Sequence, residues 1–132
     1  FFDAIRVSAG NSFAWETVVP HIFNQKYEAG FTMDLACKDM NLSYLLGQHL
    51  NVPLDLHMEV KKKMDQARVK YGDSEGCYVY PRILEDQLGE PLSLKGWDNW
   101  GYDINVVDGS IVVKHKNRPV SKHPQYNSET KV

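Results

Sequence analysis

The chain has 132 residues, of which 42% are hydrophobic and 24% are charged. These values are typical of an ordinary globular domain with a real core and exclude a disordered tail. The formal net charge of -2 at pH 7 gives no field that would hold a polyanion, so we expect no nucleic-acid partner. No stretch approaches the ~20 apolar residues of a membrane span. We therefore expect a soluble protein without a membrane partner.

The chain opens with an apolar helical pattern. Phe1, Ile5 and Ser8 or Ala9 already follow helical spacing, whereas natural termini usually begin with polar, frayed residues. We therefore expect that residues upstream of Phe1 have been removed, with a poorly recorded tag as the alternative. Gly10 is predicted to end this first helical remnant.

Two helices are predicted next. Asn11 or Ser12 can cap a helix through Trp15, which Pro20 is expected to bend or divide. A long amphipathic helix is predicted over residues 33–49. The residues expected on its apolar side are Leu35, Leu42, Leu45, Leu46 and His49.

Pro53 restarts the helical pattern, because proline has no amide hydrogen to lose in a first turn. Gly72 is predicted to end this second long helix, and Asp73 or Ser74 to cap a shorter one that ends at Gly89. The apolar stripe of the long helix is Leu56, Val60, Met64, Ala67 and Tyr71.

The character of the sequence changes after Gly89. Trp97, Trp100 and Tyr102 lie among glycines and acids, and exposed aromatic residues there would favour a contact of some kind. Asp108-Gly109 between β-branched runs predicts a tight hairpin over residues 104–114. A lone hairpin is marginal in water, so it must pack on the helices or on a partner chain. Residues 117–132 are polar and predict an extended or mobile tail.

Few motifs carry chemistry by themselves. We find no dinucleotide fingerprint and no Walker loop, and the five histidines show no zinc-ligand spacing, so no metal is expected. Cys37 and Cys77 lie far apart and lack a nucleophile context. They are interpreted as buried free thiols in a reducing compartment, which favours the cytoplasm.

One local pattern, over residues 29–43, stands out. Phe31 follows a glycine at a helix start, and Lys38 and Asp39 come two turns along. The aromatic ring and the charged pair can therefore border one cleft. The alternative for Lys38 is an ordinary helix-surface ion pair with Asp34, four residues earlier.

Around this pattern the chain resembles the β-hydroxyacid dehydrogenase family, which includes 3-hydroxyisobutyrate dehydrogenase, over residues 8–88. The order and spacing of the matching pieces carry the resemblance, since each piece alone is common. They are Ser8-Ala9-Gly10-Asn11-Ser12, Gly30-Phe31 with Leu35 and Lys38-Asp39-Met40, Val52-Pro53-Leu54, and Tyr71-Gly72-Asp73.

The resemblance implies a mainly α fold, the helical C-terminal domain of the 6-phosphogluconate dehydrogenase-like type, with a short C-terminal β-hairpin extension. We expect the truncated helical domain over residues 1–89 and the extension over residues 90–132. In that family a separate Rossmann domain binds NAD or NADP, and the active site lies between the two domains. A Rossmann domain absent from this sequence and a homo-oligomer are therefore the expected partners.

The resemblance also implies roles for three residues. Lys38 matches a cofactor-binding lysine, and Phe31 and Asp39 match residues of the substrate cleft. Phe31 as a core residue and Asp39 as a local cap or ion-pair partner remain the alternatives. The family's catalytic lysine belongs upstream of Phe1, so no catalytic residue is expected in this chain, which should be inactive alone.

The resemblance thus predicts the C-terminal part of an NAD(P)-dependent 3-hydroxyacid dehydrogenase or semialdehyde reductase, acting on a small hydroxy acid or semialdehyde. Close variants on the same scaffold are an imine reductase and a non-catalytic chromatin reader. The alternative from another class is a self-contained helical protein-interaction module without catalysis, whose hairpin recruits a partner.

Overall fold

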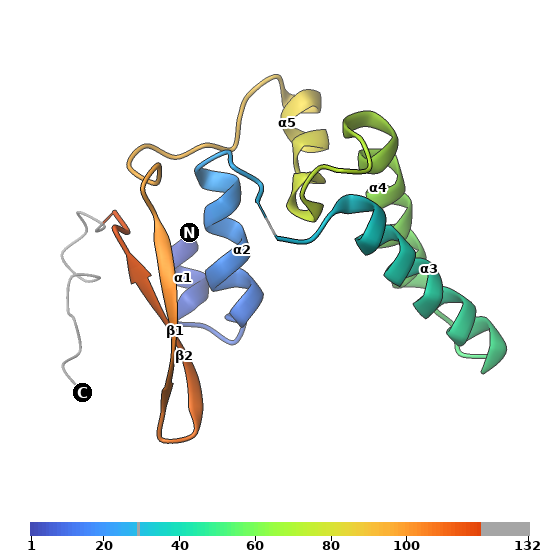
Figure 1. Ribbon diagram of the computed structural model, residues 1–132, viewed down its shortest axis with the longest axis horizontal. Coiled ribbons are helices and arrows are strands. Elements are labelled where there is room, and N and C mark those ends of the chain that lie inside the picture. Colours follow the sequence, from blue (N-terminus) through green and yellow to red (C-terminus); the bar gives the residue numbers. More distant parts are fainter. Residues whose placement is uncertain (29, 120–132) are drawn as a thin grey trace. The chain divides into compact units, whose positions relative to one another are not determined.

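The computed structural model describes residues 1–28 and 30–119 (Figure 1). The described residues form five α-helices, one 3₁₀ helix and two strands, so the predicted mainly helical fold with a C-terminal hairpin is confirmed. Most of the predicted tail lies outside the described residues. The elements are α1 (Phe2–Arg6), α2 (Phe13–Phe23), α3 (Met33–His49), α4 (Asp55–Tyr71), η1 (Cys77–Val79), α5 (Arg82–Leu88), β1 (Gly101–Val107) and β2 (Ser110–Lys116).

These elements form two compact units. Unit 1 combines Phe1–Asn24 with the described residues from Ser93 onward, and unit 2 is Gln25–Leu92. The hairpin therefore belongs to the same compact unit as the first two helices, and the predicted domain division at residues 89 and 90 stays a prediction. Within the described ranges, each helix is too short or too polar to traverse a bilayer.

The helices of unit 1 follow the capping signals of the sequence. The Ser12 hydroxyl accepts a hydrogen bond from the Trp15 amide at 3.0 Å, which confirms this residue as the cap of α2. The prediction that Pro20 could divide the helix is wrong, because α2 continues to Phe23. Proline removes only its own amide bond, and the Asn24 amide closes the following turn by donating to the Pro20 carbonyl at 3.0 Å.

Buried aromatic rings form the core of unit 1. Phe2, Trp97 and Trp100 are each buried, and the Phe2 and Trp97 rings meet edge to face with their centroids 5.3 Å apart. Trp15 and Phe23 pack around them. The hairpin therefore packs on the helices, which is one of the two predicted arrangements: burying these large rings against α1 and α2 removes them from water and attaches the hairpin to the helices.

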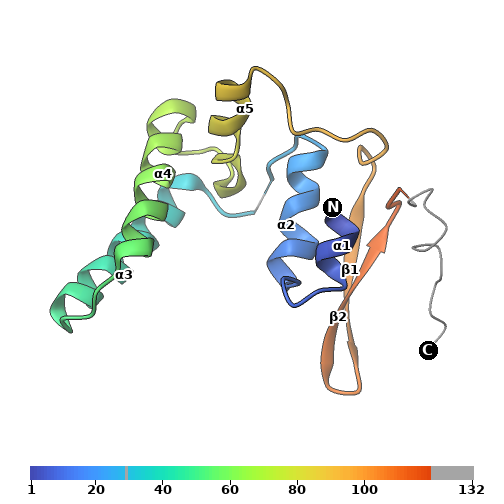
Figure 2. The ribbon, with the colours of Figure 1, turned by 180° about the vertical axis from the view of Figure 1, so that it is seen from behind.

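The hairpin has the predicted register. Val107 pairs with Ser110 beside a turn in which Asp108 and Gly109 have φ angles of 50° and 78°. These left-handed angles fit a type I′ turn, for which Asp-Gly is favoured. The turn extends beyond α1 and α2, so the hairpin base packs on the aromatic core and its tip is exposed (Figures 1 and 2).

In unit 2, α3 and α4 lie side by side, with the start and end of α3 as predicted (Figure 2). Gly47 allows a close approach near the turn between them. A Cβ at Gly47 would lie 2.2 Å from Cδ1 of Leu54, so a side chain there would clash with the residue that precedes α4.

The buried side of α3 differs from the predicted one. Met33, Ala36 and Cys37 are buried, whereas Leu42 and Leu46 of the expected apolar side are 55% and 58% exposed. Within unit 2, α3 packs against α4 and η1. The leucine side therefore faces solvent.

Two of the three predicted glycine stops are confirmed, but the stop at Gly10 and one cap are wrong. Helix α1 already ends at Arg6, four residues before Gly10. Gly72 and Gly89 follow the last residues of α4 and α5 with positive φ angles, as expected of helix-ending glycines. Neither Asp73 nor Ser74 caps the next helix, because α5 begins after Pro81 and the Asp73 carboxylate instead accepts from Arg68 at 2.6 Å.

Candidate functional site

A shallow, open pocket of about 350 Å³ lies at the N-terminal end of α3 in unit 2. One wall is the segment before the helix, which contributes Tyr27 and Phe31, and the other is the loop after α4, which contributes Ser74 and Glu75. The Phe31 side chain is exposed. Phe31 is thus available to pack against a ligand.

Backbone hydrogen bonds hold the two walls together. Thr32 and Gly76 form an isolated antiparallel bridge. The first amides of α3, which have no partner within the helix, donate to the loop carbonyls and so need no side-chain cap. Met33 N donates to Glu75 O at 2.8 Å, and Asp34 N donates to Asp73 O at 3.1 Å. In the opposite direction, the Cys77 amide of η1 donates to the Phe31 carbonyl at 2.9 Å.

A carboxylate marks the beginning of α3. The Thr32 hydroxyl donates a hydrogen bond to the carboxylate of Asp34, and this bond is the main reason that the pKa of Asp34 lies below its ordinary value. A negative charge in the first turn also interacts favourably with the helix dipole. Asp34 is therefore engaged locally and does not pair with Lys38.

The predicted charged pair lies further along α3. Lys38 Nζ and Asp39 Oδ1 are 2.7 Å apart, and the two side chains are 57% and 54% exposed. Such an exposed pair contributes little to stability. The structure thus brings Lys38 and Asp39 together, whereas Phe31 lines a pocket whose walls include neither of them.

A buried carboxylate holds the pocket wall that contains Tyr27. Glu85 of α5 is buried, and its Oε2 accepts from the Tyr27 hydroxyl at 2.5 Å. Its Oε1 accepts from Gln25 Nε2 at 2.8 Å and from the Leu92 amide at 2.7 Å. We call these four residues the Glu85 network. It ties both ends of unit 2 and one pocket wall to α5.

The network shifts the pKa values of its acid and its phenol. Burial alone would raise the pKa of Glu85, but the hydrogen bonds from Gln25, Tyr27 and Leu92 outweigh it and hold this pKa below the ordinary value. Burial and the adjacent carboxylate raise the pKa of Tyr27. Both groups therefore keep their usual charges at neutral pH, with the tyrosine as the donor.

The network also stabilises an unusual backbone. Gln25 and Tyr27 have φ angles of 59° and 51°, values that non-glycine residues seldom adopt. Sequence reasoning missed Tyr27 and Glu85, because no local signal links residues that lie 58 positions apart.

The comparison with known families adds a finding to this geometry. A family described as the NAD-binding domain of NADP-dependent 3-hydroxyisobutyrate dehydrogenase matches residues 1–79. The chain belongs to the 3-hydroxyisobutyrate dehydrogenase family. No curated protein matches the chain.

The family match divides the candidate site. The family match includes the pocket wall with Tyr27 and Phe31, and also the Lys38–Asp39 pair on α3. It ends at Val79, the last residue of η1. Glu85 lies beyond the match but supports the wall inside it. Across the part of the chain with described coordinates, no cluster of histidine, cysteine and acidic side chains is suited to a metal ion. Cys37 and Cys77 are free thiols, and burial raises the pKa of each.

Proposed function

We propose that the chain forms one side of the cofactor and substrate cleft in a cytoplasmic NAD(P)-dependent 3-hydroxyacid dehydrogenase or semialdehyde reductase. The family match over residues 1–79 is the observation that carries this proposal. The exposure of Phe31 and of the Lys38–Asp39 pair supports it, because residues of a cleft must be accessible to ligands.

The proposed roles follow from the chemistry of each side chain. The exposed ammonium of Lys38 fits the anionic phosphate or ribose region of a nicotinamide cofactor, and Asp39 positions that ammonium at 2.7 Å. Phe31 offers an apolar ring to the carbon skeleton of a small hydroxy acid or semialdehyde. The cofactor, when bound, supplies hydride transfer.

The proposal assigns no catalytic residue to residues 1–132. It requires a Rossmann domain and a catalytic lysine as partners, and this chain alone is expected to be inactive. The exposed leucine side of α3, with Leu42 and Leu46, supports a contact with a second subunit in a homo-oligomer.

A non-catalytic interaction module remains the second candidate. The observation that favours it is the exposed apolar tip of the hairpin, where Val106 and Ile111 pair on one face of the sheet. Two results together would favour the module. The wild-type hairpin would capture a partner that Val106→Lys does not capture, and the natural polypeptide would bind no nicotinamide cofactor.

Replacing Lys38 by alanine tests the proposed site in the natural polypeptide. We expect Lys38→Ala to weaken the binding of NADH or NADPH about 10–100-fold, because a hydrogen bond to a charged group contributes about 1.5–3 kcal/mol. Binding can be followed by nicotinamide fluorescence, together with the oxidation of short 3-hydroxy acids.

Lys62→Ala is the matched control, since Lys62 is an exposed lysine on α4 and lies outside the proposed site. Unchanged binding in Lys38→Ala would remove Lys38 from the site but leave the family function intact. A natural polypeptide that neither binds a nicotinamide cofactor nor oxidises a hydroxy acid would overturn the proposed function itself.

A further inference from the structure

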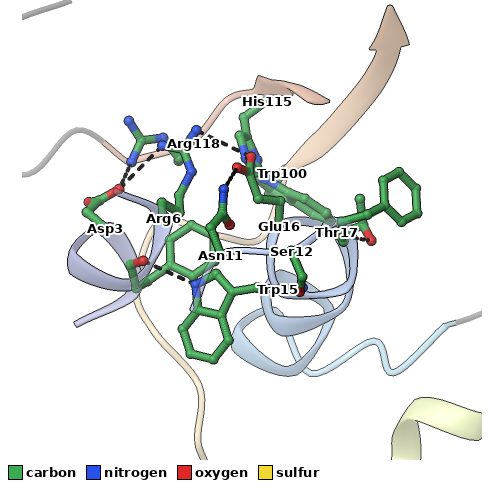
Figure 3. Close-up of polar contacts among 12 residues, drawn as sticks. Asp3, Arg6, Asn11, Ser12, Trp15, Glu16, Thr17, Trp100, His115 and Arg118 are labelled. Carbon is green, nitrogen blue, oxygen red and sulfur yellow. Dashed lines mark hydrogen bonds and ion pairs between the residues drawn. The ribbon is translucent and has the colours of Figure 1, made fainter. Parts of the chain in front are cut away.

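A histidine lies between the hairpin and α2 in unit 1, and both of its ring nitrogens are engaged (Figure 3). The His115 side chain is only 5% exposed. Nδ1 lies 3.0 Å from Nε1 of Trp100, and Nε2 lies 2.8 Å from Oε2 of Glu16. The two contacts join β2, the segment before β1 and α2 through one ring.

The contact with Trp100 determines where the ring proton lies. An indole N–H can only donate a hydrogen bond, so Nδ1 of His115 must accept and carries no proton. The single proton of the neutral ring is then on Nε2, which donates to Glu16. This geometry therefore selects the neutral Nε2–H tautomer.

Charged groups from all the neighbouring elements face this ring. Glu16 of α2 also accepts from Asn11 at 2.8 Å and from Arg6 of α1 at 3.3 Å. Arg118, which follows β2, pairs with Asp3 of α1. Elsewhere around Trp100, the ring of His21 packs edge to face on the indole, and Tyr102 lies opposite His115 in the sheet.

These surroundings oppose a second proton on the ring. Burial lowers the pKa of His115 most, Glu16 raises it, and Arg6 and Arg118 lower it, with the result that it lies below the ordinary value of 6.5. A proton added at Nδ1 would also point at the indole N–H, placing two donors 3.0 Å apart in a site closed to water.

We propose that His115 is an acid-sensitive switch: the neutral ring holds the hairpin base against α2 through Trp100 and Glu16, and protonation at Nδ1 releases it. Because Trp100 belongs to the aromatic core, loss of its hydrogen bond loosens the packing that attaches the hairpin to the helices. The switch is independent of the proposed enzymatic function.

The direction of the pH effect follows from linkage. In the folded state, His115 takes up its second ring proton less readily than it does in the unfolded state. Below pH 6.5 the unfolded state therefore binds more protons than the folded state. The stabilisation from His115 is therefore complete above pH 6.5 and is lost as the pH falls from 6.5 through the lower folded pKa.

NMR spectroscopy of the full chain tests the switch directly. Side-chain nitrogen shifts should show an unprotonated Nδ1 at neutral pH. Between about pH 8 and about pH 5, the Trp100 indole signal and the backbone amides near Trp100 and His115 should change together with the titration of His115. A proton on Nδ1 at neutral pH, or a His115 titration that leaves the indole signal unchanged, would overturn the proposal.

Two variants separate the switch from a purely structural role. Trp100→Phe keeps an aromatic ring but removes the indole N–H, so the pKa of His115 should rise because the protonated ring no longer opposes a donor. His115→Gln should abolish the acid response of the hairpin amides, whereas His49→Gln, an exposed histidine of α3, should preserve it. A response that persists in His115→Gln contradicts the switch. If either variant fails to fold, the NMR measurement of the His115 tautomer in the wild-type chain still tests the proposal.

Discussion

Phe2→Ala is expected to lower the free energy of unfolding by about 3–5 kcal/mol, whereas Phe1→Ala should lower it by less than about 0.5 kcal/mol. The two residues are adjacent and identical in type, but Phe2 is 7% exposed and Phe1 is 93% exposed. Phe2 contacts the rings of Trp15, Phe23 and Trp97, so truncation leaves a cavity that these large rings cannot fill.

Urea unfolding followed by tryptophan fluorescence measures this difference, because Trp15, Trp97 and Trp100 all lie in unit 1. Phe1→Ala serves as the matched control for the loss of one phenyl ring. Equal effects of the two substitutions would show that the aromatic residues of unit 1 do not form its core.

Glu85→Ala is expected to lower the free energy of unfolding by about 2–4 kcal/mol, because it leaves the buried Tyr27 hydroxyl, the Gln25 amide and the Leu92 backbone amide without their acceptor. Tyr27→Phe removes one of these hydrogen bonds and should cost about 1.5–3 kcal/mol, because the acceptor is a charged carboxylate. Glu90→Ala, an exposed acid near the end of α5, is the control and should have little effect.

Urea unfolding followed by far-UV circular dichroism measures these costs, and hydrogen exchange at the Tyr27 and Leu92 amides localises them. The pKa of Glu85 lies below its ordinary value of 4.5, so its stabilisation is present above that pH and is lost as the pH falls through the folded pKa. A Glu85→Ala chain as stable as Glu90→Ala would contradict the supporting role of the network.

Local signals predicted the long helices and the hairpin. A glycine that ends a helix acts through its own backbone, so Gly72 and Gly89 could be interpreted without tertiary information. The same holds for Asp108-Gly109, because the positive φ angles of a tight turn depend on those two residues alone. Pro53, which was predicted for a first helical turn, instead lies two residues before α4.

Burial could not be predicted in the same way. Periodicity correctly indicated that Leu42 and Leu46 share a side of α3, but which side is covered depends on how α4 packs. The Trp97 ring is buried because Phe2, far away in the sequence, provides the surface for it. Pro20 stays inside α2 because its neighbours bury it and the next turn closes by itself.

The candidate site was predictable only in part. Phe31, Lys38 and Asp39 were proposed from one short motif and a family resemblance, and their roles stay predictions. The second pocket wall, with Ser74 and Glu75, is formed by backbone bridging across more than forty residues, for which the motif carries no signal.

The position of Glu85 relative to the family match has a practical consequence for protein engineering. A polypeptide cut at Val79 would keep Tyr27 and discard its only acceptor in the Glu85 network, which would expose the left-handed segment before α3 to proteolysis. Fusions and shortened crystallisation variants of unit 2 should therefore extend at least to Leu92, so that α5 and the segment from Gly89 to Leu92 are retained.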